Sequence, residues 1–255
     1  MTGKEHKPAG WGTKDLTTFL DLVRNNQYAT FANHRAAVAV LERIDGAFMR
    51  IGSHLLNPTD QLTPFFLYRS HSALRAASAC AMAGQTVETF VLLRSCLEFA
   101  AYVLQIDKVP GARQKWLDRH KDVASRKAAT NAFRTDNLRP TIARCDARLG
   151  KLFDTFYQRS IEYGAHPNEQ AIMGSLQLKE GTGRIEVLQI YLHEDGAALR
   201  AAVKGTAEIG LCALFILQHV SVFTARFELL GLKEELQSLR TEVDGMDMPD
   251  RSSRK

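Results

Sequence analysis

The sequence predicts an all-α helical bundle that carries one small β-hairpin near residues 172–192. Apolar residues recur at helical spacing over most of the 255-residue chain, and only 7 prolines interrupt them. The composition, 45% hydrophobic and 24% charged, excludes a disordered chain, a collagen-like fibre and a disulfide-dense mini-protein. We expect a single domain over residues 13–244, preceded by a mobile leader (1–12) and followed by a disordered tail (245–255).

Helix start and stop signals divide the domain into elements. Thr63 and Pro64 read as an N-cap followed by proline at the first helical position, and Gly84 ends that helix. Pro58 and Asp60 mark the loop before it, and Pro110 with Gly111 breaks the chain again. The expected helices cover residues 13–24, 33–56, 63–83, 85–106, 112–133, 138–163, 195–230 and 232–243.

The stretch from Ile172 to Leu192 has a different pattern. Leu176 and Leu178 alternate with polar residues before the turn Glu180-Gly181-Thr182-Gly183, and Ile185 and Val187 alternate with polar residues after it. Alternation on both sides of a glycine-containing turn predicts a β-hairpin.

The helix over residues 85–106 is apolar on every side, which predicts a position at the centre of the bundle. Arg94 and Glu98 are its only charges after Glu88, and they lie four residues apart on one face. Burying both charges is costly without further hydrogen bonds, so we expect polar partners from neighbouring helices. The pair is either a core ion pair that fixes helix register or the floor of a polar site.

A second polar set ends the helix over residues 138–163. Its apolar stripe continues into Arg159, Tyr163 and His166, and Asn168 follows in the helix-breaking segment. His166 either takes part in a site or caps the last carbonyl groups of the helix. The helix over 63–83 adds Arg69 and Arg75, which we place on the rim of the bundle.

Neither the cysteines nor the histidines show metal-ligand spacing, so we expect no metal and no cofactor. The four cysteines are expected to be reduced thiols, and His120 is expected to pack with Trp116 on one helix face. The apolar stretch Ile209–Val222 is shorter than the roughly 20 residues that a membrane span needs. The first twelve residues have no apolar signal-peptide core. We therefore expect a cytoplasmic protein that does not contact a membrane.

Positive charge is concentrated in residues 107–151, the basic flank. This segment has twelve Lys and Arg against five Asp, although the whole chain has a net charge of only +5. The flank is either a solvated face of mixed charge or a surface that contacts the phosphates of RNA or a nucleotide. Few aromatic residues interleave with its charges, which argues against a platform for stacking single-stranded bases.

Two motifs carry a family resemblance over about residues 60–225. The run RSCLE in the apolar helix and the later EYGAHPN resemble a group of bacterial helical proteins with R-S-x-L-E and Y-x-x-H-P motifs. More distantly the arrangement resembles the HEPN superfamily of helical bundles, many of which are metal-independent RNases that act as homodimers. Their Arg-to-His signature is matched in its longest form by Arg159-SIEYGA-His166, with Ser160 where active members favour Asn, Asp or His.

The resemblance implies a HEPN-like binding or interaction module, linked to bacterial defence or stress systems and able to form a homodimer. The alternative is a metal-independent RNase. In that case Arg159 would hold phosphate, His166 would be the general acid or base, Glu98 would orient one of them and Arg94 would add positive charge. Tyr163, Arg69, Arg75 and Asn168 are the candidate binding residues. A helix running straight between Arg159 and His166 would place their Cα atoms about 10.5 Å apart along the axis, so a shared phosphate requires a bend at Gly164 or a second subunit.

Overall fold

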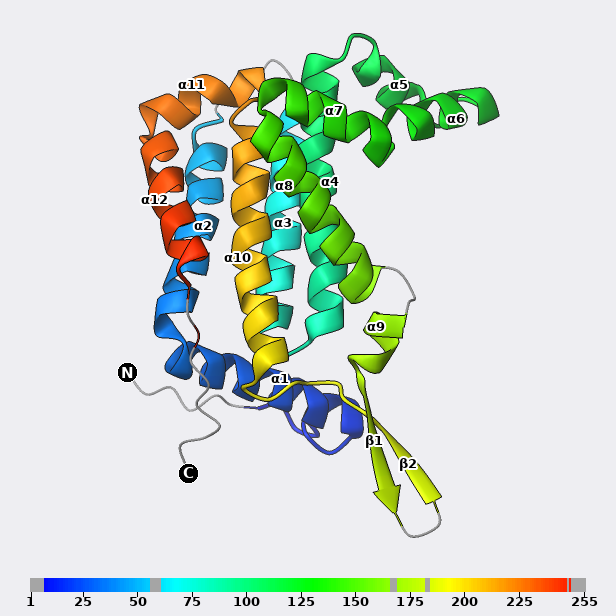
Figure 1. Ribbon diagram of the computed structural model, residues 1–255, viewed down its shortest axis with the longest axis vertical. Helices are drawn as coiled ribbons and strands as arrows, with labels where there is room; N and C mark the ends of the chain where they lie inside the picture. The colour runs from blue at the N-terminus through cyan, green and yellow to red at the C-terminus, as the bar shows by residue number, and fades with distance from the viewer. Residues whose placement is uncertain (1–6, 56–60, 166–168, 182–183, 247, 249–255) are drawn as a thin grey trace.

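The computed structural model describes residues 7–55, 61–165, 169–181, 184–246 and 248. The expected loop residues Pro58 and Asp60, the candidate site residues His166 and Asn168, and most of the expected tail lie outside these ranges. Within them the chain forms twelve α-helices, one π-helical turn and one two-stranded hairpin (Figure 1). The expectation of a mostly helical protein is confirmed.

Three long helices form the centre of the bundle, and others pack around them (Figure 1). The central helices are α3 (Leu62–Ala83), α4 (Thr86–Lys108) and α10 (Ala197–Leu217). The surrounding helices are α2 (Arg35–Ser53), α8 (Ala147–Ser160) and α12 (Leu232–Asp244). Large fully buried side chains from these helices, such as Phe48, Leu97 and Phe153, form one continuous core.

Helix α4 occupies the central position that its sequence predicts. Leu93, Cys96, Leu97 and Leu104 are completely buried, and α4 packs against both α3 and α10. By length and mean hydropathy, 1.4 over its most apolar 18-residue stretch, α4 could also cross a membrane. Because 61% of that stretch is buried against the rest of the protein, we interpret α4 as a core helix.

Two expected helices are each split in two by an aspartate that caps the second piece. The helix expected over 112–133 consists of α5 (Ala112–Asp118) and α6 (Val123–Ala132), and Asp122 accepts a 2.6 Å hydrogen bond from the Ser125 backbone N–H. The helix expected over 138–163 consists of α7 (Thr135–Cys145) and α8. There Asp146 accepts from the N–H groups of Arg148 and Leu149 at 2.8 and 3.0 Å. Both continuous-helix predictions were wrong because these aspartates satisfy the first backbone donors of a new helix.

The prediction of one long helix over residues 195–230 was also wrong. The chain turns by 109° between α10 and α11 (Ser221–Leu229), with Gln218, His219 and Val220 in the corner. Ser221 fixes the corner because its backbone N and its Oγ both donate to Asp107 Oδ2, at 3.1 and 2.9 Å. A side chain at the far end of α4 therefore holds the first residue of α11.

Helix α1 (Asp15–Asn33) is longer than expected and lies across the base of the bundle (Figure 1). Among its residues only Thr30 is buried. Its inner face is polar: Asn26, Gln27 and Thr30 donate side-chain hydrogen bonds of 2.8–3.0 Å to backbone carbonyls at the end of α3. Ahead of α1, Lys7 and Trp11 both bond to Asp21.

The predicted hairpin is confirmed. Strand β1 (Leu176–Gly181) pairs antiparallel with β2 (Arg184–Gln189), with Leu178 opposite Val187. The hairpin follows the short helix α9 (Glu169–Met173) and projects from the bundle below α8 (Figure 1).

Candidate functional site

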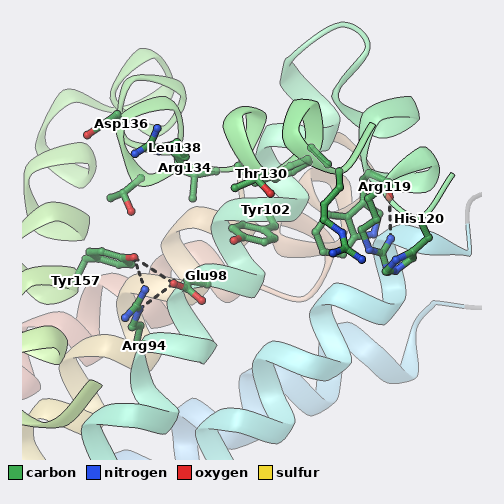
Figure 2. Close-up of a pocket in the computed structure, with 15 residues that line it drawn as sticks. Arg94, Glu98, Tyr102, Arg119, His120, Thr130, Arg134, Asp136, Leu138 and Tyr157 are labelled. Carbon is green, nitrogen blue, oxygen red and sulfur yellow. Dashed lines mark hydrogen bonds and ion pairs between the residues drawn. The ribbon is translucent and has the colours of Figure 1, made fainter. Parts of the chain in front are cut away.

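A cavity of about 600 Å³ lies where α4 and α8 meet the arm formed by α5, α6 and α7 (Figure 2). This volume is in the range that binds small molecules. Its floor is polar, one wall is aromatic and its rim is basic. The lining residues are Arg94, Glu98, Tyr102, Trp116, Arg119, His120, Arg126, Ala129, Thr130, Phe133, Arg134, Thr135, Asp136, Leu138 and Tyr157.

Arg94, Glu98 and Tyr157 form the floor as a closed hydrogen-bonded triangle (Figure 2). Arg94 Nε donates to Glu98 Oε1 at 2.9 Å, and Arg94 Nη2 donates to the Tyr157 hydroxyl at 2.9 Å. That hydroxyl donates in turn to Glu98 Oε1 at 3.2 Å, and the Arg94 guanidinium lies 5.1 Å from the centre of the Tyr157 ring. The polar partner expected for the Arg94–Glu98 pair is therefore Tyr157.

The Arg94–Glu98 pair is not sealed in the core. The two side chains retain 25% and 28% of their exposure, and they face the cavity. Of the two roles left open by the sequence, this placement favours the floor of a polar site. Water or a ligand can reach both charges.

The aromatic wall assembles from separate segments. The Tyr102 ring lies 5.6 Å from Trp116 and 5.0 Å from Phe133, and Trp116 lies 5.2 Å from Phe133. Burial, reinforced by the negative charge of Glu98, raises the pKa of Tyr102 to about 12. Its phenol is therefore a neutral hydrogen-bond donor at physiological pH.

Guanidinium groups dominate the rim. Arg119 donates to the Trp116 carbonyl at 2.7 Å, and its guanidinium stands 4.2 Å from the Trp116 ring. Arg126 and Arg134 are exposed at the opening. Among the described lining residues four arginines face two carboxylates, those of Glu98 and Asp136, so the cavity carries net positive charge.

Of the sequence-predicted site residues that the structure describes, Arg94 and Glu98 line this cavity, and the other four do not. Arg159 and Tyr163 line a different cavity, where Arg159 pairs with Glu208 of α10 rather than with Glu98. Arg69 and Arg75 are exposed, as expected, but line neither cavity. The Arg69 guanidinium lies 5.4 Å from the Phe99 ring.

Arg75 belongs to a separate network with Asp45 and His71. Arg75 holds Asp45 through bonds of 2.6 and 2.8 Å, and His71 Nε2 lies 2.6 Å from the same carboxylate. The Arg75 guanidinium keeps the pKa of Asp45 below its ordinary value. Burial lowers the pKa of His71, although Asp45 opposes that shift.

Within the described part of the chain, no group of three or more His, Cys, Asp or Glu side chains is placed to hold a metal ion. The four cysteines are free; Cys96 and Cys212 are buried, whereas Cys80 and Cys145 are partly exposed. Burial raises the pKa of the Cys96 thiol to about 12, so this thiol is unreactive at neutral pH.

Several cavity residues were missed by sequence reasoning. Tyr157 precedes the expected stripe of Arg159, Tyr163 and His166, and its hydroxyl had no visible partner. Trp116 and His120 were expected to pack one helix face, but α5 ends at Asp118, and both residues line the cavity. The spacing of Arg94 and Glu98 was the one sequence signal that led to this site.

Searches of family models, of curated proteins and of solved structures each found no match to the chain.

Proposed function

We propose that this protein is a helical binding module whose cavity at Arg94, Glu98 and Tyr157 holds a nucleotide, either free or as part of an RNA chain. The observation that carries the proposal is the combination of an aromatic wall and a guanidinium rim around one cavity of about 600 Å³. A nucleotide has a group that complements each feature: a flat base that can stack on the aromatic wall, and a phosphate that can accept hydrogen bonds from the guanidinium rim. The HEPN-like character and the link to defence or stress systems remain part of this proposal.

The geometry supports a definite orientation. A base would stack on Trp116 or Tyr102, because aromatic rings hold nucleobases without regard to sequence. The phosphate would lie toward Arg126 and Arg134, which are exposed and free to form charge-assisted hydrogen bonds from a planar fork. Glu98 Oε2, to which neither Arg94 nor Tyr157 donates, would accept a hydrogen bond from the ligand at the floor.

The basic flank supports an RNA chain as the source of the nucleotide. Its excess of seven positive charges lies on α5, α6, α7 and the first half of α8, and Arg119, Arg126 and Arg134 belong to it. In Figure 1 the α5–α6 arm extends away from the bundle, which leaves the flank open on several sides. A strand leaving the cavity could follow these charges.

Calorimetry with matched variants tests the proposal. Arg126→Gln and Arg134→Gln remove rim charges, and Lys127→Gln removes an exposed neighbour that does not line the cavity. We expect each rim variant to weaken binding of AMP by about two- to fivefold, as exposed ion pairs do, and the control to leave it unchanged. If the control and the rim variants weaken AMP equally, or if AMP does not bind, the cavity proposal is wrong.

An oligoribonucleotide arm separates the two sources. If RNA is the ligand, a uridine decamer should bind more tightly than AMP and lose affinity steeply with salt, and the rim double variant should lower the salt slope by about 1–2. Equal affinity for decamer and AMP would assign the site to a free nucleotide.

A second candidate is the metal-independent RNase that uses Arg159 and His166. It is favoured by the backbone at Gly164, which leaves helical geometry with φ 168° and ψ −29° inside the π-helical turn η1 (Ile161–Ala165). A bend at Gly164 is one of the two arrangements in which Arg159 and His166 could share a phosphate, a second subunit being the other. The test is cleavage of a mixed RNA pool in EDTA, with His166→Ala expected to remove activity by about 10²–10⁴-fold at unchanged stability. If the wild type cleaves no RNA, the RNase candidate is wrong and the binding function is the remaining candidate.

A further inference from the structure

A second cavity, of about 580 Å³, lies at the C-terminal end of α8, away from the arm formed by α5, α6 and α7. It shares no lining residue with the nucleotide cavity. Most of its described lining residues come from α4, the C-terminal end of α8, η1 and α10. The sequence-predicted site residues Arg159 and Tyr163 both line this cavity.

One side of this second cavity is apolar and aromatic. The Phe90 and Tyr163 rings lie 5.3 Å apart between centroids, tilted by 34°. Val87, Ala198 and Ala201 extend the apolar surface with small side chains. Such a surface holds a ring or a short hydrocarbon body through burial and dispersion.

The other side offers positive potential from the backbone. Two long helices begin at the cavity: Thr86 is the first residue of α4, and Ala198 is the second residue of α10. Neither the Gln85 nor the Gly196 N-cap supplies a side-chain hydrogen bond to its helix. Helix N-termini without a side-chain cap present N–H donors and the positive end of the helix dipole, and both favour an anion.

The Lys204 side chain adds to this preference. Thr86 Oγ1 does not, because it is buried without accessible surface and a ligand in the cavity cannot reach it. Lys204 lines the same cavity, and the hydrogen bond of its ammonium to the Met246 carbonyl is long, at 3.4 Å. Arg159 is paired with Glu208, so among the described lining residues Lys204 supplies the cation that no carboxylate of the cavity matches.

We propose that this cavity binds a small carboxylic acid with an apolar, ring-bearing body, independently of the nucleotide cavity. The ring packs on Phe90 and Tyr163, and the carboxylate accepts hydrogen bonds from the Lys204 ammonium and from backbone N–H groups in the first turn of α4. An apolar body fits the small side chains of the α10 wall, and the carboxylate matches the charge of Lys204. This inference does not depend on the proposed nucleotide function.

Calorimetric titration with 4-phenylbutanoate tests the proposal directly. The matched alcohol 4-phenylbutan-1-ol has the same body without the charge, and acetate has the charge without the body. We expect saturable binding of the acid at one site, binding of the alcohol weaker by about tenfold, and no measurable binding of acetate. Binding of the alcohol as tight as that of the acid, or no binding of the acid, would overturn the proposal.

Variants locate the binding. Lys204→Gln should weaken binding of the acid by about tenfold without affecting the alcohol. Thr86→Val, which removes a hydroxyl that the ligand does not reach, should leave the affinity unchanged. Ala201→Trp should abolish binding because Ala201 is an exposed wall residue, whereas Ala197→Trp, exposed on the same helix but outside the cavity, should not. Unchanged affinity in both Lys204→Gln and Ala201→Trp would refute the assignment.

A competition experiment separates the two cavities. Saturating AMP should leave the affinity for 4-phenylbutanoate unchanged, and Arg126→Gln should do the same. Displacement of the acid by AMP, or its loss in the rim variant, would place it in the nucleotide cavity and contradict a second site.

Discussion

Removing Glu98 should destabilise the protein less than removal of a fully buried ion-pair partner does. Loss of one partner of a fully buried pair costs about 3–5 kcal/mol, because the other charge is left without water or counter-charge. Here Arg94 and Glu98 retain 25% and 28% of their exposure, and Tyr157 still accepts from Arg94 at 2.9 Å. Water in the cavity can hydrate the guanidinium, so we expect Glu98→Ala to lower the free energy of unfolding by about 1–2 kcal/mol.

Urea melts of four proteins test this value: wild type, Glu98→Ala, Tyr157→Phe and the double variant. Because Tyr157 donates to Glu98 at 3.2 Å, the two single changes should not add, and the coupling should be about 0.5–1.5 kcal/mol. A loss above about 3 kcal/mol would mean that Arg94 is sealed from water. A loss below about 0.3 kcal/mol, or strict additivity, would mean that the triangle does not form.

Two further predictions concern the scaffold. Burial lowers the pKa of both His71 and His219 below 6.5, so protonation favours the unfolded chain; stability should be full above about pH 6.5 and fall as the pH drops below it. Urea melts from pH 7.5 to 5 check this. If the double variant His71→Gln/His219→Gln shows the same slope of unfolding free energy against pH as the wild type, the prediction is wrong. Gly84 has φ +81°, and a Cβ there would lie 2.2 Å from the His193 carbonyl oxygen, so Gly84→Ala should cost at least about 1–2 kcal/mol. Thermal denaturation measures this against Gly46→Ala, where a Cβ meets nothing within 4 Å and a gain of about 0.5–1 kcal/mol is expected; equal effects would refute the reasoning.

The elements predicted well from sequence are those whose signal is local. The apolar surround of α4, the alternation on both sides of the 180–183 turn, and the stop at Gly84 each depend on neighbouring residues. The breaks before α6 and α8 depend on single aspartates, Asp122 and Asp146, within segments whose periodicity still fits a helix. Either residue could equally have stood on a solvent-exposed helix face.

The corner after α10 shows a different limit. Gln218 and His219 interrupt the apolar run, but they do not by themselves require a turn. What holds the corner is Asp107, more than one hundred residues earlier, which accepts from both donors of Ser221 at the start of α11. No local pattern carries that contact.

The site was predicted only in part for the same reason. The spacing of Arg94 and Glu98 on one helix face was readable, whereas the partner of Arg159 is Glu208, 49 residues away on α10. Tyr102, Trp116 and Phe133 belong to three separate segments, so an aromatic wall could not be read from any one of them. The basic flank has few aromatic residues, but Tyr102 comes from outside the flank and completes the wall.

Trp116 fluorescence tests the central claim most directly, because this ring would contact the base while the arginine rim holds the phosphate. In a Trp11→Phe protein Trp116 is the one remaining tryptophan, since the chain has 2. Titration with AMP should quench its emission saturably, and adenosine should do so with lower affinity by about tenfold, because it lacks the phosphate. Inorganic phosphate should compete with AMP without strong quenching of its own. Emission that AMP leaves unchanged, or equal affinity for adenosine and AMP, would contradict a cavity in which ring and charge act on one ligand.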